Sequence, residues 1–272
     1  MKIIDFDRKF FEYARGWIAR HPGLTDEQVE DSYNEIMQAW ISQPADWLDG
    51  ARPDEYFERM GDADALIDLM EGYSAAGVNL PEPLYSRIVS LGEACAPRLR
   101  NIVSDGARPE ALRAEAMGML RDMGDAGLDP ILVAMVCGAR ERSELSDLAA
   151  DILSQGDGAS VPALLAAFDA APEYAQDLML DVLCNFPGDG RIYDALMRRL
   201  RNRPDERALW ASRLNKLGDP RAIEPMQRML RLTDLRYLDY IELRDAVEAL
   251  GGDAGEERAF YGDPDFEALR NL

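Results

Sequence analysis

Apolar residues recur at intervals of three and four along most of the chain, the spacing that places them on one face of an α-helix. Runs that alternate apolar and polar residues, as half-buried strands do, are absent. The helical pattern comes in short segments separated by polar turns, for example residues 129–136 and 145–155. It predicts an all-α protein built from many short helices.

These segments form a repeat with a period of about 32 residues. Glycines beside acidic or helix-ending residues recur at Gly61, Gly92, Gly124, Gly156, Gly188, Gly218 and Gly251. One helix is expected after each glycine and a second before the next, so each unit is a helical hairpin. Glycine suits the left-handed position that ends a helix, and a following aspartate can cap the next helix. We therefore expect Gly156 to adopt a positive φ and its replacement by Val to destabilise the protein.

One unit resembles a known repeat closely. The residues that carry the resemblance are Leu217, Gly218, Asp219, Pro220, Arg221, Ala222, Ile223, Pro225, Leu230, Arg244, Ala246, Ala249, Leu250 and Gly251. They resemble the HEAT repeat, in the short form found in bacterial and phycobilisome-lyase-type proteins. The resemblance implies a right-handed α-solenoid and, since HEAT-like proteins are mostly scaffolds, adaptors or chaperone-like subunits, a role in protein binding. The signatures of ankyrin and tetratricopeptide repeats, which have similar periods, are absent.

The repeats predict three parts. Residues 1–55 do not repeat and are expected to form a helical N-terminal cap, because the end of a solenoid leaves one face without a neighbour. Thr25 to Gln28 have the form of a capping box within that segment. Residues 56–253 form the repeat array, and residues 254–272 a small C-terminal cap or tail.

The composition of the chain excludes several classes of function. The chain has 272 residues, 51 acidic and 30 basic, for a net charge of −21, which argues against general binding to nucleic acid or anionic membranes. No stretch is apolar enough to span a membrane, and the acidic start does not fit a signal peptide. Three cysteines, odd in number and without metal-binding spacing, favour a reducing, cytoplasmic location.

No catalytic, cofactor-binding or metal-binding residues are expected. The single histidine, His21, removes most zinc sites and histidine-based catalytic triads. The aspartates that follow the glycines lie about one repeat apart, too far from one another in sequence for the clustered oxygens that calcium needs. There is no glycine-rich phosphate loop. We therefore expect the protein not to be an enzyme.

A binding surface is predicted on the helices that follow each Gly-Asp, which we expect to line the inner, concave face. Residues 188–217 hold eight basic and four acidic residues in an otherwise acidic chain. The candidate protein-binding residues are Arg191, Arg198, Arg201, Arg221, Arg228, Arg231, Met135, Ala134 and Ala166. The arginines would suit an acidic or amphipathic partner segment. Two plainer interpretations stay open: a solvated arginine face paired with local acids, and apolar helices buried between their neighbours.

The leading hypothesis is a non-enzymatic scaffold that binds another protein through the concave face. One alternative is a nucleic-acid enzyme resembling the HEAT-like DNA glycosylases, which the net charge disfavours. A second is a chaperone-like or lyase-like role toward a tetrapyrrole protein. The HEAT-type iron hydroxylases need paired His-Glu motifs that one histidine cannot supply. Oligomeric state and the partner's identity remain open.

Overall fold

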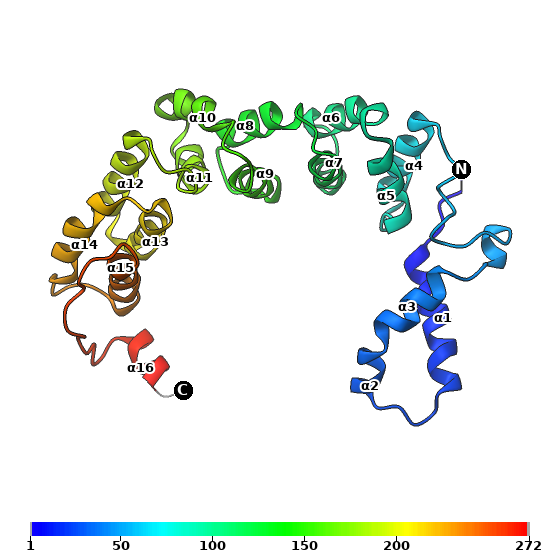
Figure 1. Cartoon of the computed structure of the whole chain (residues 1–272), viewed down its shortest axis with the longest axis horizontal. Coiled ribbons are helices and arrows are strands. Elements are labelled where there is room, and N and C mark those ends of the chain that lie inside the picture. The colour runs from blue at the N-terminus through cyan, green and yellow to red at the C-terminus, as the bar shows by residue number, and fades with distance from the viewer. Residues whose placement is uncertain (1, 271–272) are drawn as a thin grey trace. The chain divides into compact units, whose positions relative to one another are not determined.

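The computed structural model describes residues 2–270, which form α-helices and short 3-10 helices without any strand (Figure 1). The prediction of an all-α, solenoid-like fold is confirmed, because the helices pack in neighbouring pairs. The chain divides into two compact units, Met1–Ile131 and Leu132–Leu272, and the boundary lies within α8 (Leu128–Gly138). No helix of the described part is long and apolar enough to cross a membrane.

The first unit begins with a helical hairpin. Its elements are α1 (Phe6–Arg20), α2 (Asp26–Asp31), α3 (Tyr33–Ile41) and the 3-10 helix η1 (Asp46–Leu48). The expected capping box is confirmed: the Thr25 hydroxyl accepts from the Gln28 backbone N–H at 3.3 Å, and the Gln28 side chain accepts from the Thr25 N–H at 3.0 Å. It gives the N–H groups of the first turn of α2 partners that the helix itself lacks.

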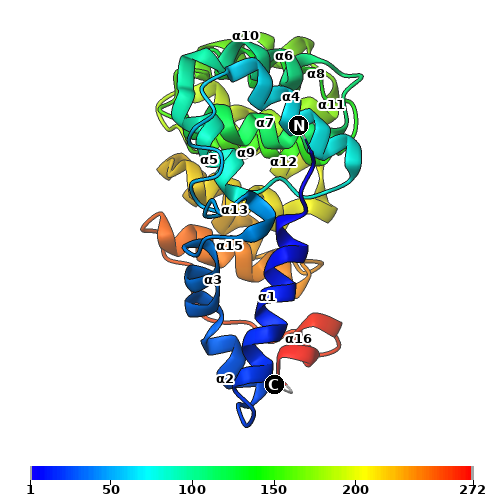
Figure 2. The same ribbon diagram turned by 90° about the vertical axis from the view of Figure 1, so that its right-hand side faces the viewer.

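Two stacked hairpins follow in the first unit. They consist of α4 (Ala63–Ala76), α5 (Glu82–Leu91), η2 (Gly92–Ala94), α6 (Ala96–Ser104) and α7 (Glu110–Asp122). The start of the chain is attached to the first of these hairpins, since the Tyr73 hydroxyl donates to the Ile4 carbonyl at 2.9 Å. Most of α1 and all of α2 and α3 extend away from that attachment (Figures 1 and 2).

The second unit contains two rows of helices. Its elements are the end of α8, then α9 (Glu144–Ser154), α10 (Val161–Ala167), η3 (Phe168–Ala170), α11 (Glu173–Leu183), α12 (Gly190–Asn202), η4 (Pro204–Glu206), α13 (Arg207–Leu217), η5 (Pro220–Ala222), α14 (Ile223–Leu230), α15 (Tyr237–Ala249) and α16 (Pro264–Arg270). Within this unit α9, α11, α13 and α15 form the inner row of a curve, and α10, α12 and α14 form the outer row (Figure 1). Each helix contacts mainly its neighbours, as in a solenoid.

The repeat spacing is reflected in the buried residues. Leu164, Leu196 and Met226, one from each outer-row helix, are fully buried. On the inner row Met179, Leu214 and Leu243 are fully buried in the same way. After α15, the aromatic rings of Tyr237, Phe260 and Phe266 pack together with centroids 5.0–6.4 Å apart and fix the C-terminal segment on α15.

The expected left-handed glycine is present in most repeats but not at Gly61 or Gly156. Gly218 ends α13 with φ 73°, and its N–H donates to the Leu214 and Asn215 carbonyls. Positive φ also occurs at Gly92, Gly124, Gly188 and Gly251. The expectation for Gly156 is wrong, because Gln155 at the end of α9 stays in the right-handed region and the positive φ, 83°, occurs two residues later at Gly158.

Replacing Gly218 by Ala is therefore expected to lower the free energy of unfolding by about 1 kcal/mol, since a Cβ is strained at positive φ. The added Cβ would meet no atom within 4 Å, so the backbone conformation alone sets the cost. Gly156→Ala is the matched control and should change stability little. Urea unfolding followed by circular dichroism measures both, and an equal loss in the two variants would contradict the assignment.

Candidate functional site

The six candidate arginines all lie on the outer row of the second unit. Arg191, Arg198 and Arg201 belong to α12, Arg221 to η5, and Arg228 and Arg231 to the end of α14, and all six side chains are exposed. The expectation that helices following each Gly-Asp line the inner face is wrong in this unit (Figure 1). The apolar pattern shows which side of a helix is buried, but the stacking of successive hairpins decides which row is inside.

Half of these arginines pair with acids in their own segment. Arg191 lies 2.7 Å from Asp189, Arg221 2.6 Å from Asp219, and Arg228 2.8 Å from Glu224. Arg198, Arg201 and Arg231 form no ion pair with any described residue, and Arg198 with Arg191 borders a small hollow of about 180 Å³ beside Phe168. These side chains are a solvated face with local pairing, and their role in binding remains a prediction.

The three apolar candidates differ in their exposure. Ala134 in α8 and Ala166 in α10 are exposed, and Met135 is half-buried. Leu132 and Val136 of α8 are fully buried. One side of this helix is therefore packed against the protein, and another side is exposed to solvent. None of the nine predicted residues lines a second hollow of this unit, which is larger than the one beside Phe168.

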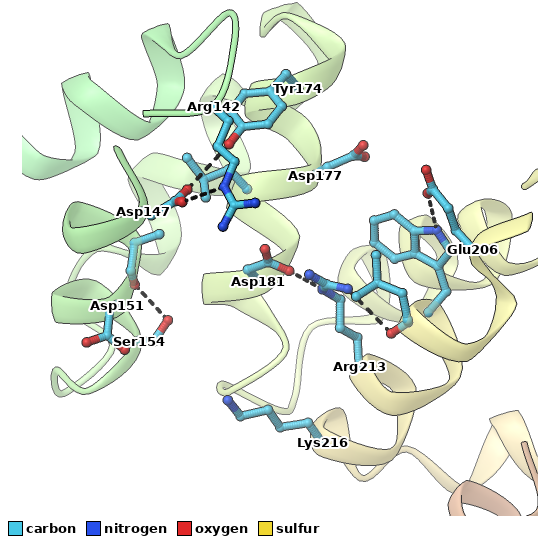
Figure 3. Close-up of a pocket in the computed structure, with 14 residues that line it drawn as sticks. Arg142, Asp147, Asp151, Ser154, Tyr174, Asp177, Asp181, Glu206, Arg213 and Lys216 are labelled. Carbon is cyan, nitrogen blue, oxygen red and sulfur yellow. Dashed lines mark hydrogen bonds and ion pairs between the residues drawn. The ribbon is translucent and has the colours of Figure 1, made fainter. Parts of the chain in front are cut away.

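That hollow, of about 630 Å³, lies on the inner row of the second unit (Figure 3). Helices α9, α11 and α13 supply most of its lining, which comprises Arg142, Asp147, Ala150, Asp151, Ser154, Tyr174, Asp177, Leu178, Asp181, Glu206, Leu209, Trp210, Arg213 and Lys216. Pairs spaced by three or four residues place both members on one face of a helix. In this way α9 and α11 each direct two aspartates toward the hollow, while α13 contributes two cations.

The α9 side of the hollow is acidic and open. Asp147 accepts from the Arg142 Nε at 3.1 Å and from the Tyr174 hydroxyl at 3.4 Å. The Arg142 side chain is almost fully exposed, so this pair is weakly held. Asp151 is exposed and accepts only from the neutral Gln155 amide, at 2.8 Å, among the described residues. This side therefore carries one carboxylate, that of Asp151, without a charged partner among the described residues, next to a weakly held ion pair.

The α11 side is acidic in sequence but neutralised by arginines from the next hairpin. Asp177 accepts from Arg199 at 2.6 Å and from Arg203 at 2.5 Å, and Asp181 pairs with Arg213. Burial alone lowers the pKa of Arg203, but its hydrogen bonds to Asp177, Glu206 and Glu173 outweigh that effect and raise it. These arginines tie α11 to α12 and α13 and fix that side of the hollow.

The α13 side combines an apolar surface with positive charge. Trp210 is buried, its indole N–H donates to Glu206 at 3.0 Å, and the Arg213 guanidinium lies 4.9 Å from its ring centroid. Leu209 beside it is 45% exposed. Lys216 is exposed and forms no ion pair with a described residue. The hollow thus offers an acidic edge on α9, an apolar patch at Leu209, and one available ammonium group.

The other chemical candidates form no reactive site in the described residues. No group of three or more histidine, cysteine or acidic side chains there is arranged to hold a metal ion. Burial raises the pKa of the Cys95, Cys137 and Cys184 thiols, which disfavours the reactive thiolate. His21 stacks on Trp17, with ring centroids 4.0 Å apart, and its Nδ1 lies 2.8 Å from the Trp17 carbonyl oxygen.

A signal for the hollow is present in the sequence, although none of the predicted residues reflects it. Asp147 and Asp151, like Asp177 and Asp181, are acidic pairs four residues apart in the second helix of successive repeats. Recurrence of such a pair in equivalent helices indicates a shared surface. The predicted residues all come from the first helix of a repeat, because the first helices were expected to line the inner face. No family model matches the chain, and no curated protein matches it in sequence.

The network around Arg203 yields a stability prediction. Arg203→Gln should lower the free energy of unfolding by about 1–2 kcal/mol, because it leaves the half-buried Asp177 with one fewer charged partner. The side chains of Arg203 and Asp177 are only 22% and 23% exposed. Arg198→Gln, the same change at an exposed site of α12 without an ion pair, should cost less than about 0.5 kcal/mol. Equal urea midpoints for the two variants would show that the network contributes no stability.

The Asp189–Arg191 pair yields a pH prediction. Hydrogen bonds from the Arg191 side chain, and then from its backbone N–H, lower the pKa of Asp189 from 3.8 to about 2. A lowered carboxylate pKa stabilises the fold above about pH 4, and this contribution disappears as the pH falls toward 2. Asp189→Asn should therefore be less stable than wild type at neutral pH, and the difference in urea midpoint should shrink toward pH 2. In an Arg191→Gln background the same substitution should show a weaker pH dependence.

Proposed function

We propose that this protein is a non-enzymatic scaffold or adaptor that binds a segment of another protein in the hollow on α9, α11 and α13. The observation that carries the proposal is the open hollow on the inner row, with exposed or weakly paired carboxylates on its α9 side and an exposed leucine on its α13 side. Stacked helical repeats present extended surfaces of this kind, and such surfaces commonly bind proteins. The resemblance of residues 217–251 to HEAT repeats supports the same role.

The charge of the hollow favours a cationic segment. Its lining contains five carboxylates and three cations. Asp177, Asp181 and Glu206 are firmly paired with arginines, and Asp147 pairs only with the almost fully exposed Arg142. Asp151, and Asp147 where a partner displaces Arg142, can bind lysine or arginine side chains. The acidic partner expected from the sequence suits the outer arginines instead, so this surface changes the proposed chemistry of the partner from acidic to basic.

The apolar part of the hollow requires an amphipathic segment. Leu209 is exposed at its edge, and Leu178 and Trp210 form part of its lining. A partner that places one or two apolar side chains against Leu209, with its cations toward α9, would bury this surface and satisfy both carboxylates. Phosphate groups of a nucleic acid would meet the same carboxylates unfavourably, which argues against the nucleic-acid alternative. The odd number of cysteines supports a cytoplasmic location.

Selection of short random peptides on the immobilised protein tests the proposal. Enriched peptides should combine lysine or arginine with leucine-like residues. Asp147→Asn with Asp151→Asn should weaken their binding roughly 5- to 30-fold, which corresponds to about 0.5–1 kcal/mol for each exposed ion pair. The loss should diminish at high salt, because salt screens exposed charges.

Asp169→Asn with Asp194→Asn is the matched control. It removes the same charge from exposed aspartates of η3 and α12, away from the α9–α11–α13 hollow. Binding to this control should equal binding to wild type. Peptides that respond to the control pair and not to the α9 pair would place the binding site on the outer row and contradict the proposal.

A further inference from the structure

The hairpin α1–α3 in the first unit is a pair of helices with almost no core of its own. Its buried side chains are Phe6 and Phe10 on α1 and Ile36 and Trp40 on α3, all near the end attached to the rest of the unit. None of residues 11–25 and 27–35 is buried. Helices as short as α2 and α3 are marginal in water without tertiary packing. The far half of the hairpin therefore needs a surface to pack against.

Apolar side chains are available on this hairpin for such packing. Phe11 is 60% exposed and Tyr33 is 50% exposed, and both rings contact the buried Phe10 ring, with centroids 6.0 and 5.5 Å from it. Ile18, two turns along α1 from Phe11, is also exposed. Residues seven apart lie on the same face of a helix, so Phe11 and Ile18 form one apolar stripe.

The charges of the hairpin indicate what covers this stripe. Helix α1 contains four basic and two acidic residues, whereas residues 26–41 contain five acidic residues and no lysine or arginine. No ion pair joins α1 to α2 or α3 among the described residues, and the Arg8 and Lys9 pairs use Glu12 of α1 itself. One side of the hairpin is thus basic and the other acidic, which makes its surface complementary to a copy of itself.

We propose that two copies of this chain pair through their α1–α3 hairpins in an antiparallel four-helix bundle. A two-fold axis places α1 of one copy along α2 and α3 of the other, so each basic helix faces an acidic one. The same arrangement buries Phe11, Ile18 and Tyr33 of both copies in a shared core. This dimer uses a surface in the first unit, so it stands or fails independently of peptide binding to the second unit.

A charge exchange tests the pairing. Arg15→Glu with Arg20→Glu makes the end of α1 acidic, and Glu30→Arg with Glu35→Arg removes most of the negative charge of residues 26–41. These side chains are exposed, so circular dichroism should show both variants folded. Sedimentation equilibrium of wild type should give a dimer of the 30.4 kDa chain, and each variant alone should dissociate at least about tenfold more readily. An equimolar mixture of the two variants should recover a wild-type-like dimer. One contact then brings the introduced glutamates of α1 toward the introduced arginines, and the other contact is the same as in wild type.

Arg198→Glu with Arg201→Glu on α12 is the matched control, and it should dimerise like wild type. Wild type that stays monomeric at roughly 100 µM would overturn the proposal. Dimer formation increases with protomer concentration, so the proposed dimer should be populated there. A wild-type dimer that neither hairpin variant weakens would also overturn it, because the interface would then lie elsewhere. Recovery in the mixture supports it directly, since a variant that had merely lost its fold could not be rescued by another variant.

Discussion

Every helix in the repeats depends on the burial of its apolar face by an adjacent hairpin. The helices are short, so hydrogen bonds along the backbone alone would not keep them folded in water. Fully buried leucine and methionine side chains recur on both rows of the second unit, where each helix contacts mainly its neighbours. Because this packing involves mainly neighbours, stability extends along the chain as a series of local contacts.

This constraint leaves the remaining faces of the helices free for charged residues. On the inner row of the second unit, arginines at residues 199, 203 and 213 bind aspartates of α11 and connect successive hairpins. On α9 the equivalent aspartates have no such partner in the next helices. A hollow with one neutralised side and one open acidic side results from this difference between otherwise similar repeats, and it determines the chemistry proposed for the bound segment.

The N-terminal hairpin departs from the same constraint. Its attached end is buried by an aromatic cluster in which Phe6 lies 5.3 Å from Trp47 and 5.7 Å from Phe57, between ring centroids. Beyond Phe10 the hairpin has no neighbouring repeat in the first unit (Figures 1 and 2). The hairpin therefore combines a buried end, which attaches it to the first unit, with an exposed end, which is the surface proposed for pairing with a second copy.

The sequence by itself determined the all-α class, the repeat period, the hairpin form of each unit and the capping box at Thr25. These features depend on residues close together in the chain, where the helical period and the chemistry of helix ends act directly. It also predicted the left-handed turn at Gly218, but the same pattern misplaced the turn at Gly156 by two residues. Local residues determine that a helix ends, whereas the packing of Phe186 against Gly158 is a tertiary contact.

Only the tertiary structure decided which row of helices is inside and which charges meet. The six arginines form a recognisable group in the sequence, yet they lie on the outer row, and the hollow is built from aspartates and cations outside the predicted set. Amphipathic periodicity reports the buried side of each helix in isolation. The sense in which successive hairpins stack depends on contacts between residues about 30 positions apart, such as Arg203 with Glu173 and Arg213 with Asp181. Those contacts are set by three-dimensional packing, which no local pattern in the chain encodes.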